Sequence, residues 1–278
     1  MNNPRTYKGH FLRKRFGQIF LTDPYIINNI IKIFNPKDNQ EIIEIGPGLG
    51  VLTLPLMKYV KHMTVIELDR NLAFRLMIHP KLKNKLTILQ NDAMKINFSA
   101  FSQSKGKKIR ILGNLPYNIS IPLIFHLFTY ISTITDMCFM LQKEVINRLI
   151  TKKNMKTYGH LTVMTQYYCQ IEHMLTVPPS SFIPIPKVES GIVRLIPHKK
   201  NHYPICDVKK LNTITKLAFN QRRKIISNSL KEIFTIEDFK KLNINPNSRA
   251  ENISIKKYCQ LANLISTNDI NYNSLLKN

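Results

Sequence analysis

Short apolar segments alternate with helical periods between residues 41 and 141, and this alternation limits the fold more than any other feature of the sequence. The segments are apolar along most of their length, as expected for strands buried on both faces of a parallel sheet. Parallel strands need helical crossovers, which then cover the sheet. The expected strands are residues 41–45, 63–67, 86–89, 109–112 and 137–141, and the expected helices between them are 49–59, 71–78 and 121–131. We therefore expect an α/β fold whose parallel sheet has helices on both faces.

The segments on either side of this region are typical of an N-terminal helix and of a closing hairpin. Asp23 and Pro24 suit an N-cap and a first helical position, so a helix is expected from there to Asn35. Residues 142–150 and 160–168 have helical periods. Residues 171–177 and 191–196 are expected to form an antiparallel hairpin that closes the sheet.

The C-terminal part changes character after a polar, basic linker at residues 197–204. Four helical periods follow it, at residues 208–219, 223–234, 236–242 and 255–265. We therefore expect two domains: residues 1–200, which include a basic N-terminal arm, and an all-helical domain of residues 201–278.

A glycine-rich segment follows the first strand and opens a helix. Gly46, Gly48 and Gly50 would let the backbone turn sharply and approach a ligand closely. Glu67 ends the second strand, where a carboxylate can accept hydrogen bonds from both hydroxyls of a ribose. Asp69 lies beyond that strand end and is the weaker candidate for this contact.

Asp92 ends the third strand, where its carboxylate can accept a hydrogen bond from the amino group of an adenine. Because the carboxyl ends of parallel strands lie along one edge of the sheet, Gly46, Glu67 and Asp92 are expected to lie close together. They fit a cofactor that contains adenosine. These three positions alone leave a nicotinamide dinucleotide and S-adenosylmethionine both open.

The sequence Asn114-Leu115-Pro116-Tyr117 follows the fourth strand and favours S-adenosylmethionine. The carbonyls of the Asn114 side chain and of Leu115 can both accept from an amine whose lone pair is delocalised into a ring, and so free that lone pair. Pro116 fixes the backbone, and Tyr117 offers a face on which an extruded base can stack. The expected chemistry is methyl transfer to an amino group, and no metal is needed. A plain turn is the structural alternative.

The charge balance indicates a polyanionic partner. Lys and Arg number 41 against 17 acidic residues, which gives a formal charge of +24. Such an excess favours binding to nucleic acid through its phosphates, although a compositional bias of the genome is an alternative explanation. The N-terminal arm, residues 1–20, also mixes basic with aromatic side chains, which suits stacking on RNA.

The cellular compartment of the protein is inferred from patterns that the sequence lacks. The four cysteines show no spacing typical of a metal site or a redox pair. The first 15 residues carry no apolar signal core, and the most apolar stretch is interrupted by His126 and Asp136. We expect a cytoplasmic, soluble protein without a membrane contact.

Together these motifs resemble the ribosomal RNA adenine dimethyltransferase family, and in particular its bacterial small-subunit branch. The resemblance covers nearly the whole chain and rests on residues 16–21, 44–50, 65–69, 91–93, 113–117, 140–145, 158–159, 184–190 and 219–224. It implies a Rossmann-like class I methyltransferase sheet. It also implies dimethylation of two adjacent adenosines near the 3′ end of small-subunit RNA, and hence a role in ribosome biogenesis.

The resemblance also implies roles for single residues. The expected catalytic residues are Asn114, Leu115, Pro116, Tyr117 and Phe182, of which Phe182 would be the second aromatic against the target base. The expected cofactor contacts are Ile19, Leu21, Gly46, Glu67, Asp92 and Asn114. Ile19 departs from the family, which has Asn or His there, so that only a backbone contact could be kept. The expected RNA-binding residues are Arg15, Lys143, Arg148, Lys187, Arg222, Arg223 and Lys224.

Three other functions remain open from the sequence. A relative that methylates adenine in large-subunit RNA shares the Asn-x-Pro-Tyr chemistry. An assembly factor that binds the small subunit, with dispensable catalysis, fits the charge equally well. A nicotinamide oxidoreductase is a more distant third. The expected partner is the small ribosomal subunit, bound by a monomer.

Overall fold

The computed structural model describes residues 6–13, 16–200 and 202–265, and it divides into two compact units. The sheet unit comprises residues 1–146 and 171–197, and the helical unit comprises residues 147–170 and 198–278. The division at Pro197 lies within a few residues of the expected boundary. Residues 147–170 were expected in the first domain, but they group with the C-terminal segment because Tyr158 donates a hydrogen bond to the carbonyl of Ile253 at 3.1 Å and α7 packs on α8 and α11.

The sheet unit is built on one seven-stranded sheet with the order β6-β5-β4-β7-β8-β11-β9. Strands β4 to β8 run parallel to their neighbours, whereas β11 runs antiparallel to β8. The expected fold class is therefore confirmed. The strands are β4 (Glu41–Ile45), β5 (Met63–Ile66), β6 (Leu86–Leu89), β7 (Ile109–Asn114), β8 (Ile134–Gln142), β9 (Cys169–Val177) and β11 (Ser190–Pro197).

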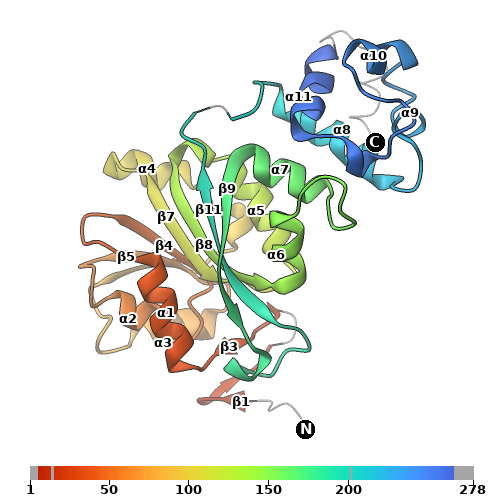
Figure 1. Ribbon diagram of the computed structural model, residues 1–278. Helices are drawn as coiled ribbons and strands as arrows, with labels where there is room; N and C mark the ends of the chain where they lie inside the picture. Colours follow the sequence, from red (N-terminus) through yellow and green to blue (C-terminus); the bar gives the residue numbers. More distant parts are fainter. Residues whose placement is uncertain (1–5, 14–15, 201, 266–278) are drawn as a thin grey trace. The chain divides into compact units, whose positions relative to one another are not determined.

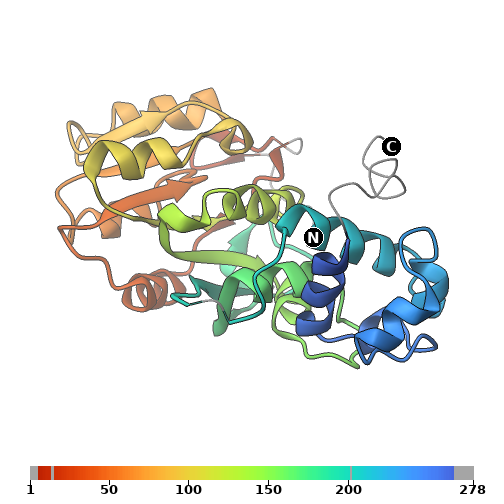
Figure 2. The same cartoon turned by 90° about the horizontal axis from the view of Figure 1, so that it is seen from above.

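Helices lie on both faces of this sheet (Figure 1), and Figure 2 shows the same layers from above. They are α1 (Pro24–Phe34), α2 (Thr53–Leu56), α3 (Arg70–Met77), α4 (Ser99–Lys105) and α5 (Ser120–Phe128), followed by α6 (Lys143–Ile150), in which the division between the units falls. The first helix begins as expected, because the Asp23 carboxylate accepts from the backbone N–H of Tyr25 at 2.9 Å and of Ile26 at 3.3 Å. It ends at Asn35, whose φ of 48° is left-handed.

Two short strand pairs were not foreseen from the sequence. Strand β1 (Thr6–Tyr7) pairs with β2 (His10–Phe11), and β3 (Phe20–Leu21) pairs antiparallel with β10 (Phe182–Ile183). The second pair joins segments far apart in the sequence, so local periodicity carries no sign of it. It fixes the N-terminal segment to the sheet unit.

The helical unit contains α7 (His160–Tyr168), α8 (Val208–Asn220), α9 (Ile226–Ser229), α10 (Ile236–Lys241) and α11 (Ile255–Leu264). The expected helix at residues 223–234 is wrong, since only α9 forms. The backbone N–H of Ile226 instead donates to Ser248 at 2.6 Å, and that of Ser227 donates to Pro246 at 3.2 Å. Among the described residues, no helix has both the length and the apolar character needed to cross a bilayer.

Candidate active site

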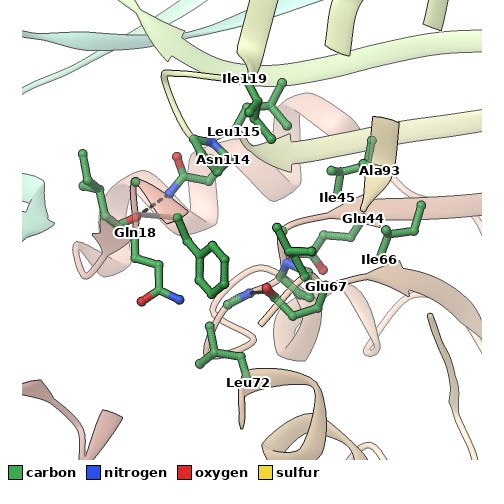
Figure 3. Close-up of a pocket in the computed structure, with 18 of the residues that line it drawn as sticks. Gln18, Glu44, Ile45, Ile66, Glu67, Leu72, Ala93, Asn114, Leu115 and Ile119 are labelled. Atoms are coloured by element: carbon green, nitrogen blue, oxygen red, sulfur yellow. Dashed lines mark hydrogen bonds between the residues drawn. The ribbon is translucent and has the colours of Figure 1, made fainter. Parts of the chain in front are cut away.

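One pocket of the sheet unit collects the carboxyl ends of four neighbouring parallel strands. It is lined by Gly46 after β4, Glu67 after β5, Asp92 after β6 and Asn114 at the end of β7. The backbone hydrogen bonds between the strands continue to this edge. The N–H of Gly46 donates to the carbonyl of Ile66 at 2.9 Å, and the N–H of Glu67 donates to the carbonyl of Leu89 at 3.0 Å. Figure 3 shows Asn114 with Leu115 and Ile119 on one side of the pocket and Glu67 with Ile66 on another. The expected meeting of these residues is therefore observed.

The glycine turn after β4 depends on left-handed backbone that other residues rarely adopt. Gly46 has a φ of 68° and Gly48 a φ of 59°. A Cβ at Gly48 would lie 3.1 Å from the ring of Phe20, so glycine also lets β3 approach the turn. The backbone N–H of Gly48 donates to Glu67 Oε2 at 3.1 Å, and this bond joins the turn to the next strand end.

Glu67 is held in a fixed orientation. Its side chain is buried, and its Oε1 accepts from the backbone N–H of Asp69 at 2.9 Å. Burial raises the pKa of the Glu67 carboxyl, while backbone donors, Asp69 and Gly48 among them, act in the opposite direction. Each carboxylate oxygen still has a lone pair for a further donor, which suits the two hydroxyls of a ribose.

Asp92 caps the short 3₁₀ turn at Ala93–Lys95. Its Oδ1 accepts from the backbone N–H of Met94 at 2.9 Å, which fixes the carboxylate while the side chain is only half-buried. The other oxygen offers an acceptor for an adenine amino group. Ile66 and Ala93 supply apolar pocket wall beside it.

Asn114 is oriented by the N-terminal segment. Its side-chain nitrogen donates to the backbone carbonyl of Ile19 at 3.0 Å (Figure 3). This bond uses the donor end of the amide, so the carbonyl oxygen Oδ1 is the end left to accept from a ligand. Ile19 thus contributes its backbone carbonyl to the orientation of Asn114, while its expected contact with the cofactor stays a prediction. Leu21 also lines the pocket and is fully buried.

Gly113 is a requirement that sequence reasoning missed. A Cβ at this position would lie 2.5 Å from the carbonyl oxygen of Ile45 in the neighbouring strand β4. Any larger residue would push β7 away from β4, and Asn114 would move with it. The expected strand ended at residue 112, whereas β7 extends to Asn114 and so contains Gly113.

Tyr117 is anchored at the far end of the Asn-Leu-Pro-Tyr loop. Its hydroxyl lies 2.7 Å from the hydroxyl of Ser190, which is fully buried at the start of β11. Burial raises the pKa of the Tyr117 hydroxyl. Leu115, Pro116 and Tyr117 all line the pocket beside Asn114. No spacing or pattern marks Ser190 as a partner of Tyr117, because the two residues are 73 positions apart.

Phe182 lies elsewhere than expected. Its side chain is 1% exposed and belongs to the hydrophobic core, where its strand β10 pairs with Leu21. It is absent from the residues that line the pocket. Burial of the apolar ring in the core is more favourable in free energy than its exposure in an open loop. In this conformation neither face of the ring is available to a base.

Two further buried carboxylates lie at or near the pocket, and the sequence had singled out only Asp69 of the two. Glu44 is 1% exposed and accepts from the Thr53 hydroxyl at 2.6 Å, and burial raises the pKa of Glu44 to about 7. Asp69, the weaker ribose candidate, caps α3 through the backbone N–H of Asn71 at 2.9 Å. It also accepts from the Gln18 side chain at 2.8 Å.

The expected RNA-binding residues differ in their exposure to solvent and in whether an acidic side chain already binds them. Lys187, Arg223 and Lys224 are exposed. Lys143 pairs with Glu189 at 2.5 Å, and Arg222 pairs with Glu251 at 2.5 Å, so both of these cations already have an acidic partner. The remaining two candidates are Arg148, which is half-buried, and Arg15, which lies outside the described residues.

The fold and the site define a class of protein. A sheet of mainly parallel strands with one antiparallel strand, together with a pocket at the carboxyl ends of the strands beside an Asn-Leu-Pro-Tyr loop, is the arrangement of a class I methyltransferase. The sequence profile of the family described as "Ribosomal RNA adenine dimethylase" matches residues 9–267. The chain belongs to this ribosomal RNA adenine dimethylase family.

Similar proteins agree with this assignment. A protein of Photorhabdus laumondii named "Ribosomal RNA small subunit methyltransferase A" is 56% identical over 266 residues, which cover 96% of this chain and 97% of that protein. A protein of the same name from Yersinia pestis is 57% identical, with the same coverage.

Two solved structures are similar in fold. A dimethyladenosine transferase from Plasmodium falciparum matches with a TM-score of 0.73 and 25% identity, covering 87% of this chain and 95% of that one. The 23S rRNA methyltransferase ErmE matches with a TM-score of 0.66 and 21% identity, covering 88% of this chain and 98% of that one, which is a likeness of fold alone.

Proposed function

We propose that this protein transfers methyl groups from S-adenosylmethionine to the N6 amines of two adjacent adenosines near the 3′ end of small-subunit ribosomal RNA. Membership of the adenine dimethylase family supports the reaction, and the names of the similar proteins support the small subunit as its target. We propose further that it acts in the cytoplasm as a monomer during small-subunit biogenesis.

The observation that carries the proposal is the orientation of Asn114. Its nitrogen is engaged by the Ile19 carbonyl at 3.0 Å, so Oδ1 is left to accept from a target amine. The adjoining carbonyl of Leu115 supplies a second acceptor in the same loop. Two acceptors on one amine draw its hydrogens out of the ring plane and make the nitrogen lone pair available.

The pocket residues fit S-adenosylmethionine. The left-handed turn at Gly46 and Gly48 brings backbone close to a ligand without a Cβ in the way. Glu67 would hold the ribose hydroxyls, and Asp92 would accept from the adenine amino group. When bound, S-adenosylmethionine supplies a methyl group activated by its positively charged sulfur.

The protein's own part in the reaction is positioning. Asn114 and Leu115 would hold the target amine, and Tyr117 would present its ring to the extruded adenine. The Tyr117 hydroxyl bond to Ser190 fixes that ring at one end. The proton released by the amine passes to water, so no side chain has to act as a base.

The RNA would be bound by cations in both units. Lys187 in the sheet unit, and Arg223 and Lys224 in the helical unit, are exposed and can release counterions from RNA phosphates. The formal charge of +24 agrees with such a partner. Arg222 contributes less directly, because its guanidinium is already bound to Glu251.

A labelled methyl donor and purified ribosomal subunits test the target. Small and large subunits are isolated from cells that lack this activity and are incubated separately with enzyme and methyl-labelled S-adenosylmethionine. Label in adenosine of the small subunit alone is expected. Label in the large subunit alone would instead identify the large-subunit reaction.

The same assay separates an enzyme from an assembly factor. Asn114→Ala removes the acceptor and is expected to lower methyl transfer by about 100-fold or more while small-subunit binding stays within about threefold. Near-normal methylation by Asn114→Ala would contradict the proposed chemistry. Gln103 is exposed on α4, so Gln103→Ala is the surface control.

A further inference from the structure

The Gln18 side chain lies at the centre of a hydrogen-bond network beside the cofactor pocket. Its Nε2 donates to Asp69 Oδ2 at 2.8 Å. Its Oε1 accepts from the backbone N–H of Arg13 at 2.8 Å and lies 3.1 Å from His10 Nε2. One amide therefore joins two parts of the N-terminal segment to an acidic residue 51 positions away.

Asp69 is the fixed end of this network. It is 1% exposed, and its Oδ1 caps helix α3 through the backbone N–H of Asn71 at 2.9 Å. The guanidinium of Arg13 lies 3.4 Å from the same oxygen. The backbone N–H of Asp69 also donates to Glu67 Oε1 at 2.9 Å, so the network continues directly into the proposed ribose ligand.

The N-terminal segment is the other end of the network. We call its described residues, 6–13 and 16–21, the strap. Residues 16–21 line the cofactor pocket, and the ring of Phe20 lies 5.9 Å from that of Tyr7 and 5.9 Å from that of His10. Arg75 donates to the carbonyl of Lys8 at 2.7 Å, which gives the strap a second attachment to α3.

We propose that Gln18 is a positioning residue that holds the strap closed over the bound cofactor by joining it to Asp69. Ile19 directly follows Gln18, so closure presents the backbone carbonyl of Ile19 to the Asn114 side chain. It also keeps residues 16–21 against the pocket, so the cofactor has to wait for the strap to open before it leaves. This inference rests on the proposed function, since it concerns retention of the methyl donor in that same pocket.

The chemistry of a glutamine explains why it suits this position. Its amide donates to the Asp69 carboxylate and accepts from the Arg13 backbone at the same time. A methionine would keep the length and most of the volume but lose both bonds. A glutamate would place a second carboxylate against Asp69, and like charges at this distance repel strongly.

The test measures binding of S-adenosylhomocysteine, the demethylated cofactor, to the full chain by calorimetry. Gln18→Met is expected to raise the dissociation constant by about 10- to 100-fold, the range for loss of hydrogen bonds to a charged group. Gln18→Glu is expected to raise it further. Gln103→Ala, an exposed glutamine on α4, is the matched control and is expected to bind normally.

A second readout separates positioning from a general loss of structure. Hydrogen exchange of the strap amides is expected to accelerate in Gln18→Met, with exchange in strands β4 and β7 unchanged. In the methylation assay, the KM for S-adenosylmethionine is expected to rise more than kcat falls, because saturating cofactor closes the strap again.

The outcomes separate this inference from the proposed function. If the unmodified protein binds S-adenosylhomocysteine and Gln18→Met binds it within twofold, Gln18 does not hold the strap, and the proposed reaction is untouched. Unchanged strap exchange in Gln18→Met would also overturn the inference. If the unmodified protein fails to bind the cofactor at all, the proposed function is contradicted, and the inference is contradicted with it.

Discussion

The side-chain nitrogen of Asn114 donates a hydrogen bond to the backbone carbonyl of Ile19 across 3.0 Å. This bond connects the loop proposed to hold the target amine with the segment that covers the cofactor pocket. A backbone carbonyl is present whatever the side chain, so the bond from Asn114 does not depend on the isoleucine side chain at position 19.

The first prediction concerns Ile19 itself. Because the contact is made by the backbone, Ile19→Ala is expected to change kcat for methyl transfer by less than about threefold, the scale of a substitution that breaks no specific interaction. Steady-state kinetics at saturating cofactor checks this. A loss of more than tenfold in kcat would mean that the isoleucine side chain has a role of its own.

The second prediction concerns the hydroxyls of Tyr117 and Ser190, 2.7 Å apart. Tyr117→Phe and Ser190→Ala each remove the bond and are expected to lower kcat by about 3- to 10-fold, which corresponds to a net hydrogen bond of about 1 kcal/mol. The two variants act on one bond, so the double variant should be no worse than the worse single one. Fully additive losses would show that the hydroxyls act separately.

The third prediction concerns the pH dependence of stability. Burial raises the pKa of Glu44 to about 7, whereas an exposed glutamate has 4.5, so the folded state holds this proton more tightly than the unfolded state does. Glu44 therefore favours folding below pH 4.5, and this contribution is lost as pH rises towards 7. The loss amounts to roughly 3 kcal/mol at most, from 1.36 kcal/mol for each pH unit.

Glu44→Gln keeps the shape of the side chain and an acceptor for the Thr53 hydroxyl but cannot ionise. Its stability relative to the unmodified protein is expected to increase between pH 5 and pH 8. Urea unfolding at both pH values measures the difference. Parallel pH dependence in the two proteins would show that Glu44 titrates normally.

The fourth prediction separates two neighbouring cations of the helical unit. Arg222→Ala removes the bonds to Glu251 and is expected to lower the free energy of unfolding by about 1 kcal/mol, because the pair is partly exposed. The backbone carbonyl of Glu251 also accepts from the backbone N–H of Asn154 at 2.9 Å. Lys224→Ala should leave the thermal midpoint unchanged but weaken RNA binding and flatten its salt dependence. Equal effects of both variants on both measurements would contradict this division.

Much of the sheet could be predicted because short apolar runs in the local sequence indicate its strands. Apolar runs at residues 86–89 and 109–112 predict strands of a parallel sheet that is covered on both faces. The polar or glycine residues that follow such strands then lie at the carboxyl edge of the sheet. Gly46, Glu67, Asp92 and Asn114 were placed together on that ground, and they line one pocket.

The rest depended on contacts between distant residues. Gln18 meets Asp69 and Tyr117 meets Ser190 only after the chain has folded, and no spacing in the sequence marks those pairs. Phe182 was assigned to the base only through the resemblance to the family, but its strand pairs with Leu21 and the side chain is buried. The helix expected at residues 223–234 failed for a similar reason, since backbone bonds to residues 246–249 replace its first turns.

Mass spectrometry of small-subunit RNA shows whether this protein dimethylates two adjacent adenosines through Asn114. Subunits from cells without the activity are incubated with S-adenosylmethionine and either the unmodified protein or Asn114→Ala, and the RNA is digested and sequenced by mass. Two adjacent N6,N6-dimethyladenosines near the 3′ end are expected with the unmodified protein, and none with Asn114→Ala. Unmethylated adenosines after incubation with the unmodified protein, or equal dimethylation by both proteins, would contradict the proposed reaction.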